Sequence, residues 1–399
     1  MKNRRFEHLQ PYPFARLSSL VNNVEGNPAY EHIPLSLGEP KHAPPDFIVA
    51  ALTDPEALAV DLTKYPATRG IEALRGSICQ WLLNRFGAEL DPETQVLPVN
   101  GTREALFSFA QALLSGDADS QVLMPNPFYQ IYEGAALLGG ATPVYLANDP
   151  DNGYQQDFSK ITPEAWQKIE LAYICSPGNP TGQVIPQAQL EELVRLALEH
   201  DFVIAADECY SEIYFDDAEP PGSLLNAALA VGNNSYKNCV VFHSLSKRSN
   251  LPGLRSGFVA GDAELMAPYF EYRTYHGSAM SPHHQNASAL AWADEAHVRE
   301  NRALYREKFA TVETILAPVF EIRRPEGGFY HWLETPIDDT EFCRRLLAQY
   351  NVTVIPGRYL ARSVNDTNPG INHVRVAWVS PLAQCSEAAE RIKAFVSAL

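Results

Sequence analysis

One lysine lies between two apolar segments, together with a hydroxyl group and a guanidinium group. Lys247 follows the strand-like residues 239–242, with Ser244 three positions before it, Arg255 eight positions after it and a second apolar run at residues 257–260. An amine can form a Schiff base with an aldehyde, and a hydroxyl with a bidentate guanidinium can hold a phosphate. The segment therefore predicts a site for a phosphorylated aldehyde, although a solvated basic loop is the common alternative for so short a motif.

Two other strand ends carry groups that suit such a ligand. Residues 100–104 open a helix after the strand-like residues 95–99. The N–H groups at that helix start, with the Thr102 hydroxyl, predict a phosphate cradle, and a plain capped helix is the alternative. Asp207 follows the apolar residues 202–206, where a carboxylate needs a partner or a cation. Its alternative role is a helix cap.

The elements that position these residues alternate between strands and helices. Strand-like runs occur at residues 95–99, 121–124, 171–175, 202–206 and 239–242, and the run at 202–206 is nearly continuously apolar, as is typical of a parallel strand buried on both faces. The helix after residue 101 presents an apolar face at the i, i+3, i+4, i+7 spacing, formed by Leu106, Phe109, Ala110 and Leu113. Open α/β sheets bind ligands at the carboxyl ends of their strands. We therefore expect a large α/β domain over residues 45–285.

The pattern of predicted strands and helices changes after residue 284. A charge-rich helical stretch at 294–317, strand-like residues 352–355 and 373–379 and a final helix predict a smaller domain over residues 290–399. We expect residues 1–44 to form an N-terminal arm and part of this domain. Arg375 lies inside an apolar strand, which is costly unless the arginine faces an anion. A structural salt bridge is the alternative.

The N-terminal arm contributes two further candidates. Residues 11–14, Pro-Tyr-Pro-Phe, are predicted to be an extended aromatic stretch, because each proline disfavours helix at the preceding residue. Phe14 is therefore a candidate at the ligand, with packing on its own domain as the alternative. Gly38 follows a short apolar run, where a glycine lets the backbone approach a ligand closely, although a simple turn is also consistent.

Composition limits the classes of partner. The chain has 399 residues, of which 46% are hydrophobic and 20% charged, and its net charge is −17. This charge disfavours nucleic acid and anionic membrane surfaces, and no apolar run approaches the roughly 20 residues that span a bilayer. The basic start at residues 1–8 lacks a following apolar core, so we expect no signal peptide and a cytoplasmic protein.

Cysteines and histidines do not predict a metal site. The six cysteines contain no C-x-x-C pair, and we expect buried free thiols rather than disulfides or zinc ligands. The neighbouring histidines His276, His283 and His284 have no other metal-like residues nearby in sequence. We expect these histidines in loops.

In their order and spacing, these segments resemble the fold-type I aminotransferases that depend on pyridoxal 5′-phosphate (PLP), and the resemblance covers essentially the whole chain. Its most diagnostic part is the loop Ser-Pro-Gly-Asn-Pro-Thr-Gly at residues 176–182. The resemblance implies an α/β fold with a large, mostly parallel sheet flanked by helices and a smaller α+β domain. It also implies that Lys247 binds PLP, that Asp207 keeps the ring nitrogen protonated, and that Arg375 binds the substrate α-carboxylate.

The resemblance assigns roles to further residues. In this family an aromatic residue stacks on the pyridine ring, and Tyr129 matches its place, with simple packing as the alternative. Asn179 and Tyr210 match groups at the phenolic oxygen. Tyr65 opens a Y-x-x-x-x-G-x-x-x-L-R segment whose tyrosine reaches the phosphate bound by the partner subunit, which implies a homodimer with shared sites. The implied cofactor-binding residues are Tyr65, Gly101, Thr102, Arg103, Tyr129, Asn179, Asp207, Tyr210, Ser244, Ser246, Lys247 and Arg255. The implied substrate-binding residues are Phe14, Gly38, Asn179 and Arg375, and the implied catalytic residues are Lys247, Asp207 and Tyr210.

Three runs point to a group within the family. Residues 9–14, 36–42 and 97–107 resemble the bacterial succinyldiaminopimelate aminotransferases of the lysine and cell-wall pathway. This likeness implies glutamate as the amino donor, released as 2-oxoglutarate, and an N-succinyl keto acid as the acceptor. Another aminotransferase or a C–S β-lyase would use nearly the same residues and stays an alternative. A sensor with this fold but no turnover is a third, and the lack of a basic DNA-binding segment before the domain disfavours it.

Overall fold

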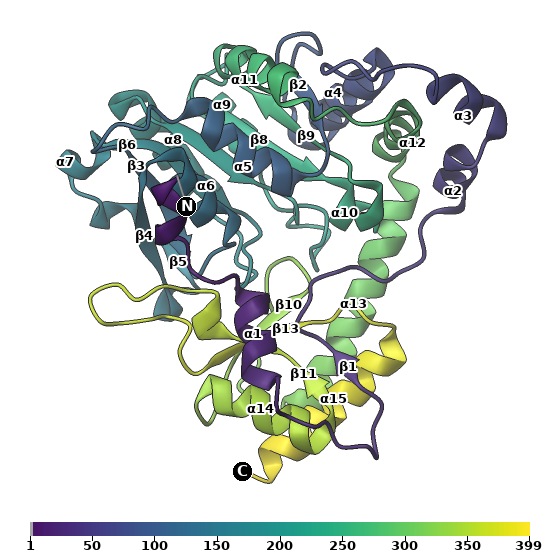
Figure 1. Cartoon of the computed structure of the whole chain (residues 1–399), viewed down its shortest axis with the longest axis vertical. Coiled ribbons are helices and arrows are strands. Elements are labelled where there is room, and N and C mark those ends of the chain that lie inside the picture. Colours follow the sequence, from purple (N-terminus) through teal and green to yellow (C-terminus); the bar gives the residue numbers. More distant parts are fainter. Residues whose placement is uncertain (1–2) are drawn as a thin grey trace.

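The computed structural model describes residues 3–399, which form a large sheet layer with helices on both faces and a smaller part below it in the view of Figure 1. The large sheet has eight strands in the order β2-β9-β8-β7-β6-β3-β4-β5. Its strands are β2 (Val96–Val99), β3 (Gln121–Asn126), β4 (Thr142–Asp149), β5 (Gln155–Gln156), β6 (Ile169–Cys175), β7 (Val203–Asp207), β8 (Cys239–Ser244) and β9 (Gly257–Gly261).

Most neighbours in this sheet are parallel. The pairs β3–β4, β3–β6, β6–β7 and β7–β8 run parallel, whereas β9 is antiparallel to both β8 and β2, and β5 is antiparallel to β4. Because β9 is antiparallel, its first residue lies at the same edge of the sheet as the last residue of β8. The predicted mostly parallel α/β sheet is confirmed.

Helices cover both faces of the sheet because its strands are apolar on both sides. In β7, Val203 and Ala205 belong to one buried cluster, and Ile204 and Ala206 belong to the other. The first cluster includes residues of α5 (Thr102–Leu113), α6 (Ile131–Gly139) and α11 (Ala263–His276). The second includes residues of α4 (Glu72–Phe86), α8 (Gln187–His200), α9 (Leu224–Ala230) and α12 (Pro282–Ala293). Such continuous apolar runs are typical of strands buried on both faces.

Shorter helices complete the large part. They are α2 (Asp46–Leu52), α3 (Pro55–Asp61), α7 (Pro163–Trp166) and α10 (Leu245–Arg248). The single turn α10 follows β8 and carries Lys247. Ser244, at the end of β8, caps this turn because its side chain accepts a hydrogen bond from the Ser246 N–H. Helix α12 packs against α2 and α4. The expected boundary at residue 285 falls inside α12, so we propose that the large domain extends through it.

The smaller part contains both ends of the chain. Its elements after α12 are α13 (Ala296–Leu316), β10 (Tyr330–Glu334), α14 (Asp339–Tyr350), β11 (Val352–Thr353), β12 (Ile355–Pro356), β13 (His373–Ala377) and α15 (Leu382–Ser397). From the N-terminal side, α1 (Pro13–Val21) packs on α14, and β1 (Ile33–Pro34) pairs in parallel with β11. Helix α13 runs from the large sheet layer into this smaller part (Figure 1).

Several local expectations were wrong. The extended stretch ends at Tyr12, because Pro13 occupies the first position of α1, where a proline loses no hydrogen bond. The histidines expected in loops are helical: His276 ends α11, and His283 and His284 lie in the first turn of α12. Strand β4 was not expected. Its sequence mixes apolar residues with a proline, an asparagine and an aspartate.

The six cysteines are free thiols, and all except the half-buried Cys79 are buried, as expected. Across residues 3–399, no helix has both the length and the apolar character that crossing a membrane requires.

Candidate active site

A cavity of about 430 Å³ lies at the edge of the large sheet where the parallel strands end. This volume is within the range of small-molecule and cofactor sites. Thirteen of the fifteen residues predicted for the site line the cavity: Phe14, Gly38, Thr102, Arg103, Tyr129, Asn179, Asp207, Tyr210, Ser244, Ser246, Lys247, Arg255 and Arg375. Gly101 lies directly before Thr102, and Tyr65 lies elsewhere on the surface.

Lys247 extends from α10 into this cavity. Its Nζ donates a 2.9 Å hydrogen bond to the carbonyl oxygen of Gly38 and lies 5.1 Å from the centre of the Phe329 ring. Burial lowers the pKa of the Lys247 amine to about 8. A substantial fraction of the amine is therefore neutral near pH 8, which a nucleophilic or basic lysine requires.

Asp207 ends β7 and is buried beside the cavity. Its Oδ2 accepts a 2.7 Å hydrogen bond from the Tyr132 hydroxyl, and its Oδ1 accepts one of 3.3 Å from the Cys209 N–H. Burial raises the pKa of the Asp207 carboxyl, and these two donors act in the opposite direction. A cationic ligand at this position would favour the carboxylate form. The protonated ring nitrogen of PLP is such a cation, so the residue fits the expected cofactor.

The residues expected to form a phosphate cradle lie together where α5 begins. Gly101 has φ 84°, and a Cβ at this position would collide with the Arg255 guanidinium. Arg255 itself has φ 54°, and its Nη2 lies 3.4 Å from the carbonyl oxygen of Asn100. Because β9 is antiparallel, Arg255 reaches the same sheet edge as the first turn of α5 and the Ser244 hydroxyl. Helix N–H groups, hydroxyls and an arginine suit a phosphate.

Arg375 approaches the cavity from the smaller part of the molecule. Its Nη1 donates to Asn179 Oδ1 at 2.9 Å, its Nη2 donates to the Ser36 carbonyl at 2.8 Å, and its guanidinium lies 4.4 Å from the centre of the Tyr330 ring. Within the described residues, no acidic side chain forms an ion pair with it. The charge of this buried arginine is therefore compensated only by neutral acceptors, an arrangement that suits an anionic ligand.

Two predicted residues are placed differently from the rest. The Arg103 side chain donates from Nε to the Tyr129 hydroxyl at 2.8 Å and from Nη2 to the Tyr12 hydroxyl at 3.2 Å. The Arg103 side chain therefore points toward the N-terminal arm, and neither of these contacts is with the proposed phosphate cradle. Tyr65 is fully exposed and does not line the cavity of its own chain.

Further residues at the site were missed, among them Tyr330, Cys209 and Tyr132. The Tyr330 hydroxyl lies 2.8 Å from the Tyr210 hydroxyl, and a Cβ on Gly38 would collide with it. The run Gly327-Gly328-Phe329-Tyr330 was a signal for it, since paired glycines before aromatic residues allow close backbone approach. Cys209 lines the cavity, with Sγ 3.1 Å from the Thr102 hydroxyl. Nothing in the sequence indicates that Tyr132 contacts Asp207.

Comparisons with known proteins agree with this geometry. The family model for aminotransferase class I and II matches residues 30–392. An LL-diaminopimelate aminotransferase from Nitratidesulfovibrio vulgaris (strain DP4) is 30% identical over 394 residues, which cover 97% of each chain. An aminotransferase structure from Neisseria meningitidis Z2491 has a TM-score of 0.93 and 46% identity, with 98% of this chain and 99% of that chain covered. Aminotransferase AspB from Helicobacter pylori 26695 has a TM-score of 0.89 and 34% identity, with coverage of 98% and 99%.

These matches extend over nearly the whole chain. They include both the large sheet and the smaller part that supplies Arg375. Together with a cavity whose lysine, buried carboxylate and phosphate cradle fit PLP, they decide the family. The chain belongs to the aminotransferase class I and II family, whose cofactor is pyridoxal 5′-phosphate.

Proposed function

We propose that this aminotransferase takes its amino group from glutamate and transfers it to an N-succinyl keto acid of the diaminopimelate pathway, as a succinyldiaminopimelate aminotransferase. The observation that carries the substrate proposal is Arg103, a third arginine in the cavity besides Arg255 and Arg375. With Arg255 assigned to the phosphate and Arg375 to the α-carboxylate, Arg103 remains for a carboxylate at the far end of the substrate. Such a far carboxylate is present in both glutamate and N-succinyl compounds.

The cofactor-facing residues have distinct proposed roles. When bound, PLP supplies a ring that accepts the electron pair released at the substrate Cα. Lys247 would hold the cofactor through its Nζ, and Asp207 would keep a proton on the ring nitrogen. Asn179 and Tyr210 would bind the phenolic oxygen, and Tyr129 would pack against the ring.

Lys247 also moves the proton. Once the amino group of the donor has replaced Lys247 on the cofactor, the freed Nζ takes the proton from Cα of the donor, since a base works best when its pKa lies near the working pH. Burial has already lowered the pKa of this amine to about 8. The contact of Nζ with the Gly38 carbonyl, at 2.9 Å, keeps the amine inside the cavity.

The substrate-facing residues come from the smaller part and the N-terminal arm. Arg375 binds the α-carboxylate with two parallel hydrogen bonds, for which a guanidinium is well shaped. The Gly38 backbone lies against the same end of the substrate. Phe14 and Tyr12, which pack 6.0 Å apart, cover the far end near Arg103.

LL-Diaminopimelate is the second candidate substrate. It is the substrate named for the relative from Nitratidesulfovibrio vulgaris. It ends in a carboxylate and a free ammonium group, whereas the N-succinyl compound has an amide in place of the ammonium. Glu39 lines the cavity and would suit that ammonium. This residue is the observation that favours the second candidate.

Half-reaction spectroscopy tests the proposal. Holoenzyme is mixed with one amino donor at a time, and the change in cofactor absorbance gives a rate constant for glutamate, N-succinyl-LL-diaminopimelate, LL-diaminopimelate and alanine. We expect fast reactions with the first two. A faster reaction with LL-diaminopimelate would replace the proposed substrate by the second candidate. Release of pyruvate, ammonia and a thiol from an added β-thioether amino acid such as cystathionine, without a keto-acid acceptor, would indicate a β-lyase, and no reaction with any amino acid would indicate a sensor.

Arg103→Met tests the far-carboxylate assignment. A hydrogen bond to a charged group contributes about 1.5–3 kcal/mol, so KM for the N-succinyl substrate should rise roughly 10- to 100-fold. Alanine has no far carboxylate and is the matched control, so its KM should not change. Equal increases for both substrates would remove Arg103 from substrate recognition.

A further inference from the structure

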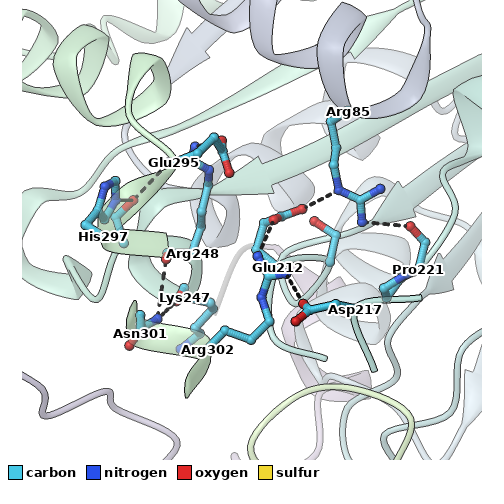
Figure 2. A network of polar contacts seen from close by, with 12 residues as sticks. Arg85, Glu212, Asp217, Pro221, Lys247, Arg248, Glu295, His297, Asn301 and Arg302 are labelled. Carbon is cyan, nitrogen blue, oxygen red and sulfur yellow. Dashed lines mark hydrogen bonds and ion pairs between the residues drawn. The ribbon is translucent and has the colours of Figure 1, made fainter. Parts of the chain in front are cut away.

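The helix that carries Lys247 is a single turn, and its last carbonyl groups need donors from elsewhere. In α10 the Leu245 carbonyl accepts from the Ser249 N–H at 3.1 Å. The last carbonyls of a helix have no partner within it. Here Asn301 of α13 supplies one: its Nδ2 donates to the Lys247 carbonyl at 3.2 Å and to the Arg248 carbonyl at 3.4 Å (Figure 2). Asn301 therefore caps the Lys247 helix from another element.

His42 fixes the orientation of that amide. His42 Nδ1 lies 2.7 Å from Asn301 Oδ1. Because Asn301 Nδ2 faces two carbonyl oxygens, its Oδ1 is the acceptor, and His42 Nδ1 must carry the hydrogen. The His42 ring packs 4.6 Å from the Tyr305 ring, and its backbone carbonyl accepts from Asn250 just after α10. His42 is thus bound to both α13 and the end of the lysine segment.

His42 belongs to the segment that passes over Lys247, residues 35–42, which we call the crossing segment. At its start, the Leu35 carbonyl accepts from the Ala377 N–H of the smaller part at 2.8 Å. In its middle, the Gly38 carbonyl accepts from Lys247 Nζ at 2.9 Å. His42 fixes the other end, before the chain enters α2, which packs on α12.

Helix α13 makes contacts with other elements on both sides of Asn301. Before Asn301, His297 Nε2 lies 2.8 Å from the Ser249 hydroxyl. After it, Arg302 Nη1 donates to Asp217 at 3.2 Å (Figure 2). Asn301 is only 7% exposed. The Asn301 amide is therefore held in place between α10 and the crossing segment.

We propose that His42 and Asn301 are a positioning pair, which holds the Lys247 backbone and the crossing segment in one arrangement so that Lys247 Nζ stays opposite Gly38. Neither residue lines the cavity, so the pair acts through Lys247 and Gly38. The inference rests on the proposed role of Lys247 in the reaction. Loss of the His42 hydrogen bond frees the amide to rotate, and both the helix cap and the end of the crossing segment then loosen.

Two substitutions of His42 separate its hydrogen bond from its packing. His42→Phe keeps a ring against Tyr305 but has no donor. His42→Asn loses the ring but places an amide N–H near the position of Nδ1. Two readouts are taken on the holoenzyme: amide hydrogen exchange of residues 35–42 and 245–250 by mass spectrometry, and the rate constant of the glutamate half-reaction.

We expect His42→Phe to exchange at least about tenfold faster in both segments and to react roughly 10- to 100-fold more slowly, as expected for a small displacement of a catalytic group. His42→Asn should remain close to wild type in both readouts. His32→Phe is the matched control, because His32 lies just before the crossing segment and its Nε2 contacts the Thr353 hydroxyl at 2.7 Å instead of Asn301. It should change neither readout.

Wild-type exchange in His42→Phe would overturn the proposal. So would equal losses in His42→Phe and His42→Asn, because the donor would then be irrelevant. Asn301→Leu gives a second test. The double variant with His42→Phe should lose no more activity and protection than Asn301→Leu alone, because both substitutions remove the same His42–Asn301 hydrogen bond. Additive losses in the double variant would overturn the proposed pair. Hydrogen exchange needs no substrate, so failure of the N-succinyl substrate would contradict the proposed function and leave this test valid.

Discussion

Tyr132 and Asp207 form a buried hydrogen bond at the wall of the cavity, in which the Tyr132 hydroxyl donates to Asp207 Oδ2 at 2.7 Å. Tyr132 is 0% exposed and Asp207 is 5% exposed. Burial raises the pKa of the Asp207 carboxyl, and the hydrogen bond from Tyr132 opposes this effect. Tyr132 therefore helps to keep Asp207 charged, which is the form that can hold a proton on the cofactor ring.

Tyr132→Phe should slow the half-reaction with glutamate roughly 10- to 100-fold, because a hydrogen bond to a charged group contributes about 1.5–3 kcal/mol. The pH below which activity falls should also move upward, since the pKa of Asp207 rises when it loses a donor. Stopped-flow absorbance over a pH series measures both effects.

Tyr173→Phe is the matched control for this prediction. The Tyr173 ring stacks on Tyr132 at 4.7 Å, but its hydroxyl donates to the Leu106 carbonyl at 2.6 Å instead of to Asp207. It should leave the pH profile unchanged. A shifted profile in Tyr173→Phe, or none in Tyr132→Phe, would show that the hydroxyl of Tyr132 does not act on Asp207.

Gly101→Ala should weaken cofactor binding by about tenfold or more. The residue has φ 84°, and its new Cβ would collide with the Arg255 guanidinium at the proposed phosphate cradle. A non-glycine residue in such strained backbone costs on the order of 1–3 kcal/mol. Titration of the cofactor-free protein with PLP, followed by absorbance, gives the dissociation constant.

Gly76→Ala provides the comparison. Gly76 lies inside α4, and a Cβ there meets nothing within 4 Å. Alanine favours helix over glycine by about 1 kcal/mol, so this variant should be slightly more stable and should bind PLP normally. Unchanged affinity in Gly101→Ala would mean that the cradle tolerates a side chain and that Arg255 can move away.

The parts of the site that follow directly after a strand were predictable from the sequence. Asp207 was found because a carboxylate ends a continuous apolar run, and Lys247 because its segment combines an amine with Ser244 and Arg255. These signals are local: each depends on residues within a few positions. Strands β6, β7 and β8 were found for the same reason, since burial on both faces favours an unbroken apolar run, whereas the mixed sequence of β4 gave no such signal.

Contacts between distant segments were not predictable. Tyr132 and Asp207 are 75 residues apart, and the Tyr210–Tyr330 contact joins residues 120 apart. Their pairing depends on how α6 and β10 pack, which no local pattern specifies. The side-chain direction of Arg103 was not predictable for the same reason. Its position at the start of α5 was found, but its contact with Tyr12 depends on the path of the N-terminal arm.

Lys247 should make the stability of the cofactor-free protein depend on pH. Burial lowers the pKa of the amine from 10.5 to about 8, so between these values the unfolded chain binds more protons than the folded chain. Stability therefore rises with pH across this window and is lowest below pH 8. Lys247→Met removes the cost of burying the charged amine, so its free energy of unfolding at pH 7 should exceed that of wild type by about 2 kcal/mol. Partial solvation of the amine keeps this difference below the full value that the pKa shift implies. The difference should vanish above about pH 10.5.

Urea unfolding of the cofactor-free protein at several pH values measures this difference. Lys237→Met is the control, because the Lys237 side chain is 54% exposed and should give the same small change at every pH. A Lys247→Met variant whose stability follows that of wild type from pH 7 to pH 10 would show that the Lys247 amine is not desolvated.

The last prediction concerns a second copy of the chain. Tyr65 is fully exposed, and Val60 and Leu62 beside it are 52% and 73% exposed. Neighbouring exposed apolar side chains are typical of an interaction surface. We propose a homodimer in which Tyr65 reaches the phosphate bound by the partner subunit, through an interface above about 2,000 Å². Because a twofold arrangement repeats the same contacts at both sites, each site would then need residues of both chains.

Complementation between Tyr65→Ala and Lys247→Ala tests the shared site. Each variant alone should be nearly inactive with saturating substrate and limiting PLP. If Tyr65 acts in the partner's site, a mixed dimer has one site with both defects and one site with neither. Unfolding and refolding an equal mixture should therefore restore up to about a quarter of wild-type activity, since half of the dimers are mixed and each of these has one intact site. Activity after refolding is compared with the sedimentation of the same samples. A fully active monomer, or a mixture as inactive as its parents when Tyr65→Ala alone is severely impaired, would refute the shared site.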